Sequence, residues 1–114
     1  MAALYQRKNC SMVFYPGAFN MTTGPAHWEL LARARAMDNQ MYVAVVSPAR
    51  NNDADYKAWG YSSVANPYGE IIAKAECGEE IVYADIDLDK MRETRANLPY
   101  LSQKRKDLYD VVQY

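Results

Sequence analysis

Short apolar runs alternate with amphipathic stretches along the first half of the chain. The runs over residues 12–15 and 41–47 are typical of buried strands, and Pro16-Gly17 closes the first one. Between them, a helix is predicted from Pro25 to residue 39, with Glu29 and Arg33 spaced for an ion pair on its polar side. The apolar stripe of this helix, which we expect to face the core, consists of His27, Leu30, Leu31, Ala34 and Met37.

The second half of the chain predicts a hairpin, a strand and a helix. Residues 61–65 and 70–74 flank Asn66-Pro67-Tyr68-Gly69, a sequence that a type I turn favours. A further strand is predicted over residues 80–86. Asp87 can cap a helix over residues 88–97, which Pro99 ends.

Residues 2–8 have the pattern of a helix end, with basic residues in the last turn and Asn9 as its stop. The order helix, strand, helix, strand, hairpin, strand, helix predicts an α/β fold with a mixed sheet. Two buried strands and one helix need more sheet beside them. We therefore expect the chain to be part of a domain.

Composition and charge narrow the class of protein. The chain has 114 residues, of which 50% are apolar and 24% charged, and its formal net charge is −1. Nucleic-acid and membrane-surface proteins carry a broad basic excess, so neither class is expected. No apolar run approaches the ~20 residues of a membrane span. Cys10 and Cys77 have no zinc-ligand spacing and are interpreted as reduced thiols of an intracellular protein, with no metal site.

The residues that carry chemistry do not form a complete active site by spacing alone. His27 lies on the apolar stripe, where a packing role is favoured over catalysis. Cys10 lies between a helix end and a strand start, so a structural role is expected. Asp85 and Asp87 have a spacing that suits a metal, but a helix cap explains Asp87 more simply. The basic run over residues 104–106 could meet phosphate, although a solvated run is commoner.

The sequence also resembles a known family, and this resemblance predicts a function that residue spacing alone does not. The Phe-Asn-Met-Thr-Thr-Gly-Pro-Ala-His-Trp run of residues 19–28 and the Ser-Pro-Ala-Arg loop of residues 47–50 resemble the nitrilase (C–N hydrolase) superfamily, in its omega-amidase branch. The stretches that carry the resemblance are residues 15–31, 33–39, 47–50, 58–64, 66–70, 81–88 and 105–109.

The resemblance implies a four-layer α-β-β-α sandwich and hydrolysis of amides by a Glu-Lys-Cys triad. None of the three triad positions matches a residue of this chain. The implied nucleophile would lie about two helical turns before Met1. Residues 1–114 are accordingly expected to be the C-terminal portion of the domain, without the N-terminal half that holds the catalytic residues, so that the chain contains no catalytic residue and is inactive alone.

The resemblance also assigns substrate contacts to Phe19 and Thr23, with Asn20 and Thr22 as weaker candidates in the same loop. An aromatic side chain can form one wall of a narrow substrate pocket, and a threonine hydroxyl can donate a hydrogen bond to a substrate oxygen. An Asx-turn at Asn20 and a helix cap at Thr22 or Thr23 remain equally open. Tyr61 stands where relatives often have His, so an aromatic side chain is kept at this position.

The implied activity is hydrolysis of the terminal amide of 2-oxoglutaramate or 2-oxosuccinamate, without a cofactor or a metal. The implied assembly is a homodimer that packs the opening helix and the helix over residues 25–39 against a second subunit. Two alternatives stay open: a truncated, non-catalytic module that dimerises or binds carboxylates, and another C–N hydrolase, such as a deaminated-glutathione amidase or a carbamoyl-amide hydrolase. The expected location is the cytoplasm, with mitochondria as the alternative.

Overall fold

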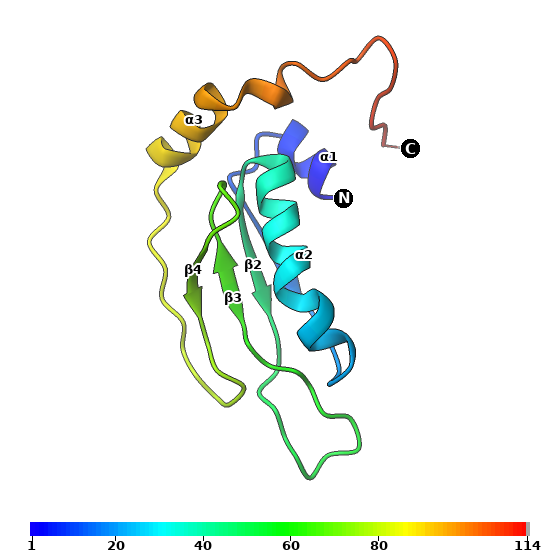
Figure 1. Ribbon diagram of the computed structural model, residues 1–114, viewed down its shortest axis with the longest axis vertical. Helices are drawn as coiled ribbons and strands as arrows, with labels where there is room; N and C mark the ends of the chain where they lie inside the picture. The colour runs from blue at the N-terminus through cyan, green and yellow to red at the C-terminus, as the bar shows by residue number, and fades with distance from the viewer. Residues whose placement is uncertain (114) are drawn as a thin grey trace.

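The chain folds as one mixed sheet covered on one face by a long helix (Figure 1). The computed structural model describes residues 1–113. In chain order the elements are α1 (Ala2–Arg7), β1 (Met12–Pro16), α2 (Thr23–Asn39), β2 (Tyr42–Val46), β3 (Ser63–Ala65), β4 (Ile71–Lys74), α3 (Leu88–Asn97) and the 3-10 helix η1 (Pro99–Leu101).

The strand order is β1-β2-β3-β4. β1 and β2 run parallel, with Val13 opposite Val43, and α2 connects them. β2, β3 and β4 are antiparallel neighbours. Parallel strands need a long crossover, whereas antiparallel ones can be joined by a tight turn, so the helix falls in the first connection and the hairpin in the last. The predicted α/β class with a mixed sheet is confirmed.

The core lies between α2 and the sheet, but α2 presents a different face to it from the one predicted. Ala32 and Ala36 are fully buried, together with Trp28. Leu30 and Met37 of the predicted stripe are 61% and 48% exposed. Small side chains let the helix approach the strands closely, and the helix is therefore oriented by its alanines and its tryptophan rather than by its larger apolar residues.

The predicted Glu29–Arg33 ion pair also does not form. Glu29 pairs with Lys74 of β4 across 2.7 Å, while Arg33 Nε donates to the carbonyl oxygen of Gly69 at 2.8 Å. Both side chains thus tie α2 to the β3–β4 hairpin instead of to each other. The helical spacing of Glu29 and Arg33 could not predict that each would find its partner on the hairpin.

The predicted hairpin and its turn are confirmed. Gly69 N donates to the carbonyl oxygen of Asn66 at 2.9 Å, which closes the turn. Asn66 is buried, and its Oδ1 accepts from the backbone N–H groups of Tyr68 and Glu70. Gly69 has a φ of +80°, which a glycine adopts without strain.

The predicted helix over residues 88–97 is also confirmed. Asp87 Oδ1 accepts from the N–H groups of Asp89 and Lys90, each at 2.9 Å. Asp87 is therefore a helix cap, as favoured over a metal ligand. The opening helix ends as predicted too, with Asn9 at a left-handed φ of 59°.

The predicted strand over residues 80–86 is wrong. This segment is extended but pairs with no strand among the described residues, and Ile81 is 75% exposed. It is fixed at its end, where Tyr42 Oη donates to the carbonyl oxygen of Asp87 and accepts from its N–H. A strand requires a neighbouring backbone edge, and the apolar pattern alone could not supply one.

The sheet face opposite α2 is largely open. Phe14 of β1 is 62% exposed and Val46 of β2 is 45% exposed, so the chain by itself covers only part of the sheet, as expected for a part of a domain. A hollow of about 550 Å³ lies between this face and the 80–86 segment, bordered by Met12, Phe14, Val46, Val64, Ile81 and Ile86 among others. In residues 1–113, no helix is both long and apolar enough to cross a membrane.

Candidate functional site

Three of the predicted substrate contacts lie in the loop between β1 and α2, and the fourth, Thr23, is the first residue of α2, at the end of the sheet away from α3 (Figure 1). This loop faces the long connection over residues 47–62 that joins β2 to β3. Such loop clusters at one end of a rigid sheet are where binding residues commonly lie. The geometry divides the four residues into two groups.

Asn20, Thr22 and Thr23 are held together by one oxygen atom. Asn20 Oδ1 accepts from Thr22 N at 3.0 Å, from Thr23 N at 2.8 Å and from Thr23 Oγ1 at 3.0 Å. Gly24 N donates to the backbone oxygen of Asn20 at 2.8 Å. The Asx-turn at Asn20 is therefore present and starts α2, whereas the Thr22 side chain makes no capping bond. A role for these three residues in binding substrate stays a prediction.

Phe19 lies apart from that group. Its ring meets the Trp28 ring edge to face, with centroids 5.0 Å apart. It lines a cavity of about 200 Å³ whose other residues include Tyr15, Gly17, Trp28, Leu31 and Arg35, and Thr23 is not among them.

Two polar groups at this cavity were missed in the sequence. Tyr15 Oη is buried without a hydrogen-bond partner among residues 1–113, and the Arg35 guanidinium lies 5.8 Å from the centre of the Tyr15 ring. The only signal was spacing: Trp28 and Arg35 are seven residues apart on α2 and so share a face. An aromatic wall with a phenolic hydroxyl and a guanidinium can hold a short carbon chain that ends in a polar or anionic group.

The 47–62 connection holds the Phe19 loop from the other side. Trp59 N donates to the carbonyl oxygen of Phe19 at 2.7 Å, and Tyr56 Oη donates to that of Ala18 at 2.6 Å. Trp28 Nε1 donates to the carbonyl oxygen of Tyr61 at 2.8 Å. All three bonds end on main-chain carbonyl oxygens, and the first two join the Phe19 loop to the 47–62 connection, so the position of one depends on the other.

No nucleophilic set is assembled in the described chain. Cys10 follows α1, and Cys77 follows β4; both are free thiols, and neither sulfur bonds a side chain among residues 1–113. His27 is exposed on α2, so its predicted packing role is wrong. No group of three or more His, Cys, Asp or Glu in residues 1–113 could hold a metal.

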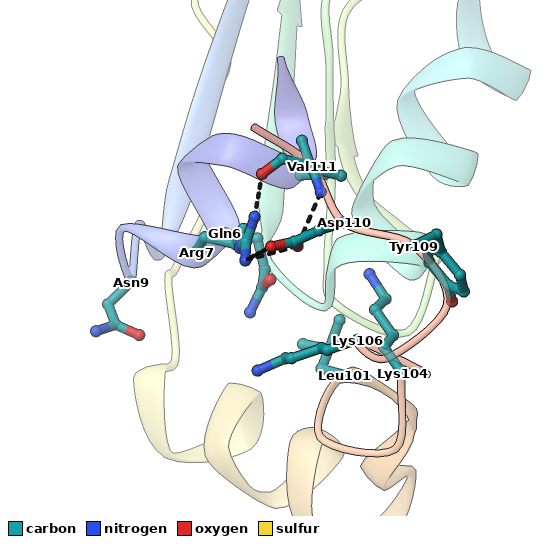
Figure 2. Close-up of a pocket in the computed structure, with 10 residues that line it drawn as sticks. Gln6, Arg7, Asn9, Leu101, Lys104, Lys106, Tyr109, Asp110 and Val111 are labelled. Carbon is teal, nitrogen blue, oxygen red and sulfur yellow. Dashed lines mark hydrogen bonds and ion pairs between the residues drawn. The ribbon is translucent and has the colours of Figure 1, made fainter. Parts of the chain in front are cut away.

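A second hollow, of about 250 Å³, separates α1 from the C-terminal segment (Figure 2). Arg7 reaches across it to Asp110 at 2.7 Å and to the carbonyl oxygen of Val111, and this guanidinium lowers the pKa of the Asp110 carboxyl. Lys104 and Lys106 line the hollow, whereas Arg105 pairs with Asp107. The predicted basic run is therefore divided, and only its two lysines face this space.

Comparison with known proteins identifies a family. The carbon-nitrogen hydrolase family matches residues 1–96. Omega-amidase NIT2 of Bos taurus is 60% identical over 111 residues, which cover 97% of this chain and 40% of that protein. Omega-amidase NIT2 of Homo sapiens is 59% identical over the same shares. The chain thus spans 40% of the length of these curated relatives.

Solved structures share the fold. The chain superposes on Saccharomyces cerevisiae Nit3, a member of branch 10 of the nitrilase superfamily, with a TM-score of 0.88 and 48% identity, covering 92% of this chain and 38% of that one. The Caenorhabditis elegans NitFhit protein gives a TM-score of 0.90 at 32% identity, covering 96% of this chain and 26% of that one.

Proposed function

Because the chain belongs to the carbon-nitrogen hydrolase family, we propose that it forms part of an omega-amidase. The reaction is hydrolysis of the terminal amide of 2-oxoglutaramate or 2-oxosuccinamate to the 2-oxo dicarboxylate and ammonia. The observation that carries this proposal is the 60% identity to an omega-amidase over 97% of the chain.

In this proposal residues 1–114 are the C-terminal portion of the catalytic domain, and the missing portion brings the Glu-Lys-Cys triad. The glutamate, as the base, takes the proton of the cysteine thiol, and the resulting thiolate adds to the amide carbonyl. The glutamate then passes that proton to the leaving nitrogen as the C–N bond breaks and ammonia is released. The lysine stabilises the oxyanion, and water then cleaves the thioester. The open sheet face beside Phe14 supports the proposal, because a second layer of the sandwich would cover it.

The part of this chain in the proposed site is the loop after β1. Phe19 and the rings around it form an apolar wall for the carbon chain of the substrate. Thr23 offers a hydroxyl to the substrate carboxylate. Asn20 holds Thr23 in place, and the Thr22 amide is fixed by the same oxygen. No cofactor or metal takes part.

The proposed assembly is a homodimer, located in the cytoplasm or in mitochondria. Leu30 and Met37 are exposed on the outer side of α2, which supports burial of this helix face against a second subunit. The open alternative of a non-catalytic module would use the same surface without any chemistry.

The test uses the longest polypeptide that carries this sequence in its natural source. Ammonia release is measured from 2-oxoglutaramate, from deaminated glutathione and from a carbamoyl amide. A specificity constant highest for 2-oxoglutaramate is expected. Preference for either of the other substrates would assign a different C–N hydrolase, and no release from any of them would leave the non-catalytic module.

A further inference from the structure

The connection over residues 47–62 has few backbone bonds of its own to hold its last part. Ala58 is buried, but it lies outside every strand, so its carbonyl oxygen has no partner in a sheet ladder. The same is true of the carbonyl oxygen of Trp59. A buried carbonyl without a donor is costly, and such groups therefore need a donor from elsewhere in the fold.

Arg50 supplies both donors. Its Nε donates to the carbonyl oxygen of Ala58 at 3.3 Å, and its Nη2 donates to that of Trp59 at 2.7 Å. The guanidinium also lies 5.1 Å from the centre of the Trp59 ring and 5.8 Å from that of Tyr61. The backbone of Arg50 is itself fixed, because its N–H donates to the carbonyl oxygen of Cys77 at 2.7 Å.

The segment that Arg50 holds is the one that contacts the proposed substrate wall. Trp59 N donates to the carbonyl oxygen of Phe19, and the Trp59 side chain covers Gly24 at the start of α2. A path of direct contacts therefore runs from Arg50 through Trp59 to Phe19. Arg50 does not line the cavity beside Phe19.

We propose that Arg50 is a positioning residue of the proposed amidase: its guanidinium holds residues 58–59 against the Phe19 loop and so fixes the aromatic wall of the substrate site. This inference rests on the proposed function for its effect on catalysis. A lysine could not replace the arginine, because one ammonium nitrogen cannot place two fixed donors on two carbonyl oxygens as the planar guanidinium does.

The test compares Arg50→Gln and Arg50→Lys with wild type in the full-length protein. Arg33→Gln is the matched control, since Arg33 likewise donates to a main-chain carbonyl, that of Gly69, but holds the β3–β4 hairpin. The first readout is hydrogen exchange at the Trp59 amide. We expect the exchange rate of the Trp59 amide to rise about tenfold or more in both Arg50 variants. The exchange rate of the Tyr42 amide, in the sheet, should be unchanged. Unchanged exchange at Trp59, or wild-type exchange in Arg50→Lys, would overturn the inference.

The second readout is steady-state kinetics with 2-oxoglutaramate. A displaced wall loosens substrate binding, so KM should rise about tenfold in Arg50→Gln while kcat stays within about threefold. A purely structural role would lower the active fraction and hence kcat, leaving KM unchanged, and this result would overturn the positioning role. A wild-type protein without amidase activity would refute the proposed function alone, because the exchange readout needs no substrate.

Discussion

Gly24, in the first turn of α2, lies directly under the indole of Trp59. A Cβ built on Gly24 would come 2.2 Å from Trp59 Cγ and 2.4 Å from its Cβ. No side chain fits in that space, so the contact between the start of α2 and the 47–62 connection requires a glycine here.

Gly24→Ala should therefore destabilise the protein, although alanine is normally the better helix residue. The added methyl group must displace Trp59, and overpacking of this kind costs about 1–3 kcal/mol. Thermal unfolding measures the effect. Gly78→Ala is the control, because a Cβ on Gly78 meets nothing within 4 Å. Equal melting temperatures for the two variants would contradict the predicted contact.

Thr23→Val should weaken the use of a substrate that carries a carboxylate. The Thr23 hydroxyl donates to Asn20 Oδ1 in this structure, and we expect it to turn to the substrate carboxylate, since a charged acceptor forms the stronger bond. Its loss should remove about 1.5–3 kcal/mol, or roughly ten- to a hundredfold in kcat/KM. Amide substrates without the carboxylate should lose less.

The contrary result for Thr23→Val would be an equal loss for both classes of substrate with a lower melting temperature. In that case the hydroxyl would serve only the turn at Asn20. The cost would then be about 1 kcal/mol of stability, as for a lost helix cap.

Asp87→Ala should destabilise α3. Asp87 Oδ1 accepts from two backbone N–H groups that have no partner inside the helix, so the variant should lose about 0.5–2 kcal/mol of unfolding free energy. Denaturant unfolding measures this loss. Asp85→Ala is the control, since Asp85 is exposed and caps no helix. A comparable loss in the control would show that the cap is not the cause.

The titration of Asp110 should depend on Arg7. The Arg7 guanidinium bonds this carboxylate and lowers its pKa below the ordinary value of 3.8. The stabilisation from this ion pair is therefore fully present above the unfolded-state pKa of Asp110. It is lost as the pH falls through the lower pKa of the folded state. Carboxyl-carbon NMR shifts against pH should show the midpoint rising in Arg7→Gln. In Lys8→Gln, which changes the neighbouring exposed charge, the midpoint should stay near that of wild type.

The purified 114-residue chain should release no ammonia from 2-oxoglutaramate and should self-associate. The proposed Glu-Lys-Cys triad is not among its residues. The open sheet face around Phe14 and Ile81 also leaves apolar surface in contact with water. Ammonia assays and light scattering test both statements. Release that Cys10→Ala abolishes, or a monodisperse monomer with a cooperative melting transition, would contradict them.

The sequence by itself determined the elements whose causes are local. The Asn66–Gly69 turn and the Asp87 cap depend on contacts within four residues, and both form as predicted. The family could be named from the run over residues 19–28 for a related reason, because a long contiguous motif needs no knowledge of contacts. For the candidate site, the resemblance pointed to the loop after β1 and the first residue of α2, and the roles of Phe19, Asn20, Thr22 and Thr23 in binding substrate stay predictions.

Only the tertiary structure decided which surfaces meet. The side of α2 that faces the core contains Ala32 and not Leu30, which the apolar pattern had predicted there, because close approach to the sheet favours small side chains. Residues 80–86 did not become a strand, since no neighbouring edge was available to them. The unpartnered hydroxyl of Tyr15 and the arginine fork of Arg50 likewise depend on segments distant in sequence. A periodic pattern specifies what a segment is able to bury, but the partner that covers it is set by the packing of the whole chain.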